Sequence, residues 1–332
     1  MTPDAKTQLV LALAREVGFD LAGVAPAGPV RRAAYYRQWL AAGYGGTMTY
    51  LEHNVQSRAE PARLLPGTRS IICVAVNYKR ADGYLGPPMA VGPPRPAEEP
   101  TGIIAQYARG YDYHLVLRRM MLRLVNRLRE RLPEPFEARM FVDTAPILEK
   151  ELAVAAGLGW MGKNTCLLNA GLGSYLLLGE IVSTLELTAD EPRHGRCGSC
   201  TRCVDACPAG AFIGPYRLDA ARCAAYLTIE HRGPIAPHLQ PVLQNRVFGC
   251  DACQQVCPYN APTPLGTHPE IAAELMPQRV NLLPLIALCA EEHRRITRGS
   301  ATRRASAPMW QRNAAIVLAN LQGHGQGVRK RP

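Results

Sequence analysis

Two cysteine motifs in the second half of the chain constrain its fold more than any other feature. The first, C-x2-C-x2-C-x3-C-P, runs from Cys197 to Pro208, and the second, C-x2-C-x3-C-P, runs from Cys250 to Pro258. In ferredoxin-type sequences, three closely spaced thiolates bind one iron–sulfur cubane, while the cysteine before the proline reaches the other cluster. The spacing therefore predicts two 4Fe-4S clusters that are held crosswise between the motifs.

This rule assigns four thiolates to each cluster. The second motif lacks a leading cysteine, and Cys223, which lies between the motifs, is the natural replacement. Paired clusters relay electrons, so we expect them to feed a reductive reaction at a further redox centre. The first cluster is expected to take Cys197, Cys200, Cys203 and Cys257, and the second Cys207, Cys223, Cys250 and Cys253.

Two all-cysteine zinc sites are the alternative, because they would also use eight thiolates. Zinc ribbons present separated C-x2-C pairs, whereas the first motif is an unbroken run, so the spacing favours iron–sulfur clusters. Three of the eleven cysteines stand outside these motifs and their link. Cys73 and Cys289 lie in apolar segments and are predicted to be core residues. Cys166 follows a glycine-rich segment and receives no role.

The first 185 residues alternate between helical and strand-like patterns, which is typical of an α+β domain. Residues 81–103 are rich in proline and glycine and are predicted to be irregular. Residues 190–265 show little periodicity, and the pattern is helical from Ile271 onward. Helices are predicted over 5–18, 31–42, 114–132 and 147–156, and strands over 21–25, 70–77, 136–142 and 175–184.

Composition and charge narrow the class of protein. The chain is 47% hydrophobic and 20% charged, with no secretory signal and no apolar stretch of membrane-spanning length, so we expect a cytoplasmic protein without a membrane anchor. Its net charge is +11, and no acidic residue follows Glu292 while nine lysines and arginines do. A basic end of this kind suits RNA, but a solvated basic tail is the alternative, and charge alone leaves both open.

Two further segments resemble known motifs. Gly157 to Lys163 meets the G-x4-G-K spacing of a phosphate-binding loop, but Asn164 replaces the magnesium-binding serine or threonine and the segment follows a helix. ATP binding is therefore not expected. Asp143 ends an apolar strand shortly before Pro146 and Glu149, and these residues alone favour a helix cap over a catalytic acid.

Taken together, the segments resemble the epoxyqueuosine reductase family almost from end to end. The cysteine motifs alone are shared with many ferredoxins, but their combination with the Asp143 block and with Gly162-Lys163-Asn164 is specific. The matching segments are 46–51, 58–61, 65–67, 77–78, 107–110, 112–114, 142–164, 173–174, 178–180, both cysteine motifs with Cys223, 299–301 and 312–313.

The resemblance implies that the protein reduces epoxyqueuosine to queuosine at the wobble position of tRNA. It implies a cobalamin, as cob(II)alamin, beside two 4Fe-4S clusters. The expected regions are a cobalamin-binding, reductive-dehalogenase-like α+β domain (1–188), a ferredoxin-like double-cluster domain (189–268) and a short, basic, HEAT-like helical region for tRNA (269–332). The usual D-x-H-x-x-G corrinoid motif is incomplete, because Leu117 stands where glycine belongs, but this family is not expected to need a protein histidine on cobalt.

The resemblance also implies site residues. Asp143 matches the family's proton donor, which overturns the cap interpretation and requires burial to raise its pKa. Gln106 stands where an arginine is commoner. The positions implied for cobalamin are Arg58, Asp143, Asn164, Ser174, Thr228 and Asp251, and those for tRNA phosphates are Arg303, Arg304, Arg312 and the 329–331 tail.

Two other functions compete with this one. A small-molecule corrinoid reductase, like a reductive dehalogenase, usually carries an export signal and has no need of a basic C-terminus. A ferredoxin-type electron carrier would not need the additional 185-residue domain. The expected partners are tRNA and an external electron donor of the flavodoxin or ferredoxin type, and the expected oligomeric state is a monomer.

Overall fold

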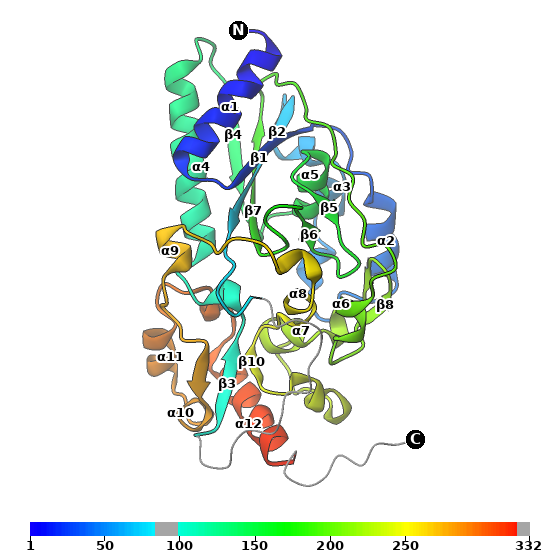
Figure 1. Ribbon diagram of the computed structural model, residues 1–332, viewed down its shortest axis with the longest axis vertical. Helices are drawn as coiled ribbons and strands as arrows, with labels where there is room; N and C mark the ends of the chain where they lie inside the picture. The colour runs from blue at the N-terminus through cyan, green and yellow to red at the C-terminus, as the bar shows by residue number, and fades with distance from the viewer. Residues whose placement is uncertain (84–98, 324–332) are drawn as a thin grey trace.

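A four-stranded antiparallel sheet organises the first half of the molecule, in the order β1-β2-β7-β4. The computed structural model describes residues 1–83 and 99–323 (Figure 1). The strands are β1 (Leu21–Pro26), β2 (Ser70–Asn77), β4 (Ala138–Phe141) and β7 (Leu176–Ser183).

The two central strands are covered on both faces, which explains why SIICVAVN reads as a continuous apolar run. Side chains alternate along a strand, so Ile72 and Val74 enter one core with α1 and α4, while Ile71 and Cys73 enter another with α5. The helices are α1 (Pro3–Val17), α4 (Tyr113–Arg131) and α5 (Glu149–Ala155). The predicted core position of Cys73 is therefore confirmed.

The predicted helices and strands of this half are all present, with ends within two or three residues of those expected. The first helix shows why its ends could be read from sequence: the Thr2 hydroxyl accepts a hydrogen bond from the Ala5 N–H, and Gly18 takes a left-handed φ of 104° just beyond the last turn. The remaining elements here are α2 (Ala33–Ala41), α3 (Val55–Ala59), β5 (Trp160–Met161) and β6 (Leu167–Leu168).

The cysteine-rich segment contains only short elements, as its weak periodicity predicted. They are α6 (Arg202–Asp205), β8 (Phe212–Gly214), β9 (Arg217–Leu218), α7 (Ala224–Ile229), β10 (Arg246–Phe248) and α8 (Ala252–Gln255). Short 3-10 turns occupy Thr49–Leu51, Pro61–Leu64, Gln106–Ala108, Ala220–Arg222, Pro237–Leu243, Pro258–Asn260 and Ala301–Arg304.

A second sheet, in the order β10-β3-β11, joins three distant segments. Its central strand β3 (Thr101–Ile104) falls in the range 81–103 that was predicted to be irregular, and residues 84–98 of that range lie outside the described residues. The prediction was wrong at β3 because the strand pairs with β10 and with β11 (Arg279–Asn281), and local sequence does not reveal such partners.

The last described segment is helical, as predicted, and packs on this second sheet. Trp310 is fully buried and stacks on Phe248 with ring centroids 5.5 Å apart. Cys289, however, is exposed and its Sγ accepts the Glu292 N–H at the start of α11, so its predicted place in the core was wrong. The helices are α9 (Pro269–Ala272), α10 (Leu282–Ile286), α11 (Ala290–Ile296) and α12 (Ala307–Gly323).

No helix within residues 1–83 and 99–323 is long and apolar enough to cross a membrane.

Candidate functional site

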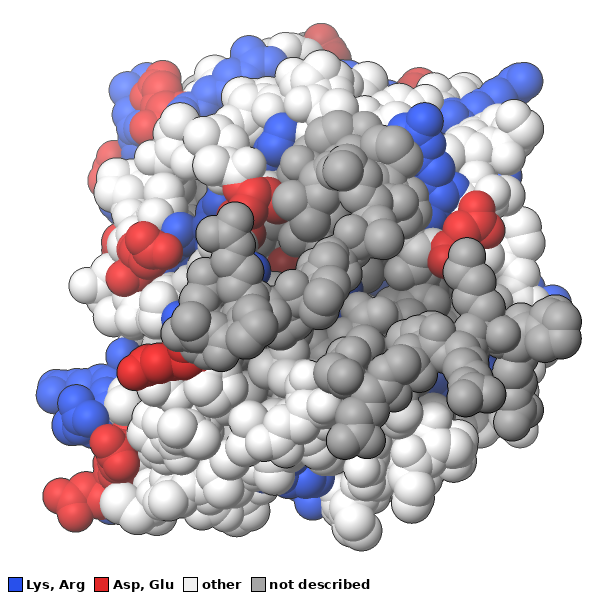
Figure 2. Space-filling model, turned by 60° about the horizontal axis from the view of Figure 1, so that its bottom comes forward, with Lys and Arg blue, Asp and Glu red and all other residues white. Residues whose placement is uncertain are grey.

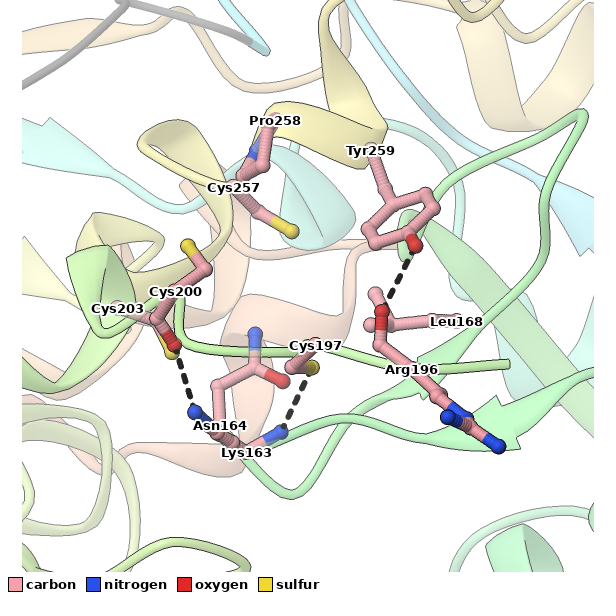
Figure 3. A pocket seen from close by; sticks show the side chains of 10 residues that line it. All are labelled: Lys163, Asn164, Leu168, Arg196, Cys197, Cys200, Cys203, Cys257, Pro258 and Tyr259. Atoms are coloured by element: carbon pink, nitrogen blue, oxygen red, sulfur yellow. Dashed lines mark hydrogen bonds between the residues drawn. The ribbon is translucent and has the colours of Figure 1, made fainter. Parts of the chain in front are cut away.

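Four cysteine thiols from both motifs line one cavity of about 290 Å³ (Figure 3). Two come from the loop that leads into α6, Cys203 lies in α6 itself, and the fourth precedes Pro258 in the second motif. The structure thus brings together the set expected from the crosswise rule, in a space that suits a multi-atom cluster. We refer to Cys197, Cys200, Cys203 and Cys257 as the first thiol group.

The thiolates of this first group would repel one another. Burial raises the pKa of Cys203 to about 12, helped by repulsion from Cys257 and the other two thiolates, and it raises the pKa of Cys257 to about 11. Four such thiolates need positive charge among them, and iron ions supply it. Within residues 1–83 and 99–323, no group of three or more His, Cys, Asp or Glu side chains is arranged to hold a single metal ion.

A second set of four thiols lies together around α7 and α8. Burial raises the pKa of Cys223 to about 11, with further repulsion from Cys250 and Cys207. Cys253 is repelled by Cys250 and Cys223 as well. Cys223 therefore stands where the second motif is one ligand short. We refer to Cys207, Cys223, Cys250 and Cys253 as the second thiol group.

Cys166, for which sequence motifs indicate no role, contacts this second thiol group. The Cys253 S–H donates a hydrogen bond to the Cys166 sulfur, which lowers the pKa of Cys166 to about 7. The two residues are 87 positions apart in sequence, and no motif predicts their contact.

The Gly162-Lys163-Asn164 segment, which resembles a phosphate-binding loop, holds the first cysteine loop instead. Lys163 Nζ donates to the carbonyls of Gly198 (2.7 Å) and Cys200 (3.0 Å), and the Lys163 N–H points to Cys197 Sγ at 3.5 Å. Asn164 carries its amide into the space between the thiols (Figure 3). The lysine is therefore committed to protein carbonyls.

An acidic site forms where β4 ends. Asp143 has a left-handed φ of 51°, and its side chain is 55% exposed. Its Oδ2 accepts hydrogen bonds from Tyr113 Oη (2.9 Å) and His114 Nε2 (3.2 Å), while His114 Nδ1 bonds Asp112 at 2.7 Å. The imidazole therefore bridges two carboxylates. The helix cap favoured from residues alone is wrong, because α5 begins after Leu148 with no side-chain cap.

The charge state of this site differs from the expectation. Burial tends to raise the pKa of Asp143, but the hydrogen bonds from His114 and Tyr113 and the positive charge of Arg304 bring it below its ordinary value. Burial tends to lower the pKa of His114, yet its two carboxylate partners raise it to about 9. At neutral pH the proton therefore sits on the imidazole and Asp143 is ionised, the reverse of an aspartic acid kept neutral by burial.

Two further carboxyls lie behind Asp143. The Asp143 N–H donates to Glu149 Oε1 at 2.5 Å, and burial together with the charge of Asp143 raises the pKa of Glu149 to about 7. Glu180 on β7 is fully buried and has no hydrogen-bond partner among the described residues, so burial raises its pKa well above the ordinary value. Sequence reasoning missed both, although an acid inside the apolar run of residues 176–182 was a signal for Glu180.

The residues implied for cobalamin do not all lie together: Asn164 lines the cavity of the first thiol group, and the others lie near Asp143 or the second thiol group. Arg58 is buried beside the Asp143 loop, where Nη1 donates to the Ala145 carbonyl at 3.2 Å. Ser174 lies near the second thiol group, because Gln254 Nε2 donates to its carbonyl at 2.9 Å. Asp251 adjoins Cys250, accepts the Gln106 N–H at 2.8 Å and has a pKa raised by burial to about 6.

Thr228 and Gln106 have structural partners of their own. The Thr228 hydroxyl donates to the Ala224 carbonyl at 2.8 Å and accepts the Gly249 N–H at 2.9 Å, so it fixes the backbone just before Cys250. Gln106 Oε1 accepts the Arg80 N–H at 2.9 Å. Both side chains are buried, and both residues hydrogen-bond to the segment that contains Cys250.

The three arginines implied for tRNA have different surroundings. Arg304 forms a two-point ion pair with Glu230 at 2.7–2.8 Å. Arg312 is partly buried and donates to the carbonyls of Leu227, His231 and Gly233 at 2.5–2.7 Å. Arg303 is exposed, with no ion pair in the described residues. On the face shown in Figure 2, acidic and basic side chains are interspersed where residues are described, and the 329–331 tail lies outside them.

Comparison with known proteins decides the family. A family model described as "Epoxyqueuosine reductase QueG, DUF1730" matches residues 58–144, and a "4Fe-4S double cluster binding domain" matches residues 196–260. The epoxyqueuosine reductase of Xanthomonas campestris is 41% identical over 94% of this chain and 86% of its own. The chain belongs to the epoxyqueuosine reductase family. The family's enzyme from Pseudomonas aeruginosa is 40% identical over 92% of this chain and 83% of its own.

Solved structures of the same family share the fold. An epoxyqueuosine reductase crystallised with an epoxyqueuosine-modified stem loop of tRNA-Tyr superposes with a TM-score of 0.84 at 29% identity, over 95% of this chain and 81% of that one. The Streptococcus thermophilus enzyme gives 0.80 at 30% identity, over 95% and 81%. The Bacillus subtilis enzyme, described with an aspartate catalytic loop swung out of its active site, gives 0.83 at 28% identity, over 96% and 82%.

Proposed function

We propose that this chain reduces epoxyqueuosine to queuosine at the wobble position of tRNA. The observation that carries the proposal is the pair of crosswise thiol groups in a chain of this family, together with the acid site at Asp143. Converting the epoxide to an alkene breaks two carbon–oxygen bonds, consumes two electrons and two protons, and releases water. The chain must therefore supply both an electron path and a proton source.

The two thiol groups would hold the electron path. Cys197, Cys200, Cys203 and Cys257 would bind one 4Fe-4S cluster, and Cys207, Cys223, Cys250 and Cys253 the other. When bound, such clusters each carry one electron at a time. The thiolate repulsion described above fits this assignment, because iron neutralises it.

Cobalamin would be held by residues near Asp143 and the second thiol group, together with Asn164 from the lining of the first thiol cavity. When bound, it supplies a cobalt centre that accepts single electrons and delivers them to the carbon–oxygen bond. The residues available to hold it are polar and incompletely paired: within the described chain, buried Arg58 Nε and Asn164 Nδ2 have no hydrogen-bond partner. A ligand rich in amides and phosphate would satisfy them. The proposed contacts are Arg58, Asp143, Asn164, Ser174, Thr228 and Asp251.

One of the two protons would come from His114 and Asp143 acting as one unit, and the second from solvent, which reaches the half-exposed Asp143 side chain. The imidazolium holds the proton at neutral pH, and its Nε2–H already points to Asp143 Oδ2. We propose that Asp143 protonates the departing oxygen with this proton, while Tyr113 orients the carboxylate. Behind Asp143, burial raises the pKa of Glu180 well above its ordinary value and that of Glu149 to about 7, so these two carboxyls carry less negative charge at neutral pH than exposed ones would.

The remaining proposals concern the setting of the reaction. We propose the division into residues 1–188, 189–268 and 269–332, a monomer in the cytoplasm, tRNA contacts by Arg303, Arg304 and Arg312, and an external flavodoxin- or ferredoxin-type electron donor. Arg304 has the most direct support among the arginines, because its charge acts on Asp143.

A deletion strain tests the function. Loss of the gene should replace queuosine with epoxyqueuosine in tRNA, and a plasmid with the wild-type gene should restore queuosine, whereas one with Asp143→Ala should not. Unchanged queuosine in the deletion strain would refute the proposal. A small-molecule corrinoid reductase predicts that outcome, while an electron carrier predicts a protein that binds clusters but no corrinoid.

A further inference from the structure

A group of exposed arginines surrounds the outer side of the first thiol group. Arg31, Arg32, Arg193 and His194 line a cavity of about 440 Å³ together with Trp160. Arg196 lines the neighbouring cavity that the thiols share. Arg202 and Arg217 are exposed close by, the first beside Cys203 and the second beside Tyr216. We refer to Arg31, Arg193, Arg196, Arg202 and Arg217 as the basic rim.

Direct contacts join the two cavities into one surface. The Trp160 and Tyr259 rings meet edge to face at 5.0 Å, and Tyr259 Oη donates to the Arg196 carbonyl at 2.8 Å. On the other side, the Tyr216 N–H donates to the Lys163 carbonyl at 3.1 Å. Burial, and then the charges of Cys197 and Cys203, raise the pKa of Tyr216. A single residue, Tyr259 on one side and Tyr216 on the other, therefore connects the basic rim to the segments that surround the first thiol group.

The rim is not neutralised by the protein itself. In the part of the chain that the structure describes, none of its five arginines forms an ion pair within 4.0 Å, although the charge of Arg31 acts on Glu151, which the neighbouring Arg32 approaches at 3.8 Å. Asp205, the nearest acid to Arg202 in sequence, accepts a hydrogen bond from Thr201 instead. Unpaired like charges repel, so the surface is electrostatically ready for a negatively charged partner.

The two thiol groups face different parts of the molecule. The first adjoins the rim, on the edge where Figure 1 places α2, α6 and β8; the 2.6 Å hydrogen bond from Trp39 Nε1 to the Leu218 carbonyl confirms that α2 lies against β9 there. The second adjoins Asp251 and the Ser174–Gln254 contact. The helix α4, which carries the Asp143 partners, runs along the opposite edge. Electrons that enter at the rim would thus meet the first group before the second.

We propose that the basic rim docks the acidic face of a one-electron carrier protein, which reduces the cluster on the first thiol group. This rests on the proposed function for the presence of the clusters. In each encounter one electron leaves the reduced carrier, the cluster takes it up, and no bond forms or breaks. Two encounters supply the two electrons that one epoxide consumes. Opposite charges speed such association, and salt screens the effect.

The test measures cluster reduction, not turnover. The full chain loaded with its clusters is mixed anaerobically with a reduced acidic flavodoxin, and the bleaching of cluster absorbance is followed by stopped flow at low and high salt. The test variant is Arg193→Glu with Arg196→Glu. The matched control is Arg118→Glu with Arg123→Glu, which places the same charge change on exposed residues of α4. Photoreduced deazariboflavin, a neutral reductant, checks that the clusters are intact.

The rim variant should be reduced by flavodoxin at least about tenfold more slowly at low salt, with a smaller difference at high salt and none with deazariboflavin. The α4 variant should behave as wild type. Equal rates for rim variant and wild type would overturn the proposal. So would a rim variant that loses tRNA binding while keeping its rate of reduction, because the rim would then be an RNA surface. If tRNA is not a substrate but the rim still controls reduction, the proposed function fails and this inference stands.

Discussion

Replacing Glu149 by glutamine isolates the effect of the carboxyl behind Asp143. Glutamine keeps the oxygen that accepts the Asp143 N–H but cannot ionise. In the folded chain the pKa of Glu149 is raised from 4.5 to about 7 by burial and by Asp143. At about 1.4 kcal/mol per pKa unit, this corresponds to at most about 3 kcal/mol of destabilisation when Glu149 is ionised.

The sign follows from proton binding. Between pH 4.5 and about 7 the folded chain holds a proton on Glu149 that the unfolded chain has released, so the free energy of unfolding falls as the pH rises through this window. Above about pH 7 the loss in the free energy of unfolding is constant, and below pH 4.5 there is no loss. Glu149→Gln should therefore match wild type at pH 4.5 and be more stable by up to about 3 kcal/mol at pH 8.

Thermal unfolding of the cluster-loaded protein, followed by circular dichroism at both pH values, measures this difference. Glu130→Gln is the control, because Glu130 is exposed on α4 and has no ion pair among the described residues. A Glu149→Gln variant that gained no stability at pH 8, or gained as much at pH 4.5, would show that Glu149 is not a strained, partly buried carboxyl.

Three other changes test separate parts of the site. His114→Ala removes the imidazolium from Asp143, so turnover on tRNA should fall about 100-fold. The decline of the wild-type rate near pH 9 should also disappear, and an unchanged pH profile would exclude His114 as the group that holds the proton. Cys223→Ser should retain about half of the iron by elemental analysis, and full iron content would remove Cys223 from the ligand set. Arg312→Ala should lower the free energy of unfolding in urea by about 3 kcal/mol, because three carbonyls lose their donor. Arg303→Ala should lower it by less than about 0.5 kcal/mol. Equal effects would contradict the structural role of Arg312.

The parts of the fold that local patterns specify could be predicted from sequence. The strand at residues 70–77 was found with its observed ends, because a β-branched apolar run between a glycine turn and polar residues leaves few alternatives. β3 could not be found in this way, since its four residues form a strand only against β10 and β11, more than 140 positions away.

The same division applies to the site. Cysteine spacing was enough to group the seven thiols of the two motifs, because that pattern is local and repeated, and the missing leading cysteine of the second motif pointed to Cys223. The charge state of Asp143 was predicted in the wrong direction, because it depends on Tyr113 and His114, which lie on α4, 30 and 29 positions upstream. The contact of Cys166 with Cys253 depends on the fold in the same way.

Nucleoside analysis by mass spectrometry tests the central claim most directly. The purified chain is reconstituted anaerobically with iron, sulfide and cobalamin, reduced, and given tRNA that carries epoxyqueuosine. We predict that the modified nucleoside loses one oxygen atom and becomes queuosine, and that Asp143→Ala, loaded equally, leaves it unchanged. Epoxyqueuosine that persists with the fully loaded and reduced wild-type chain would contradict the account.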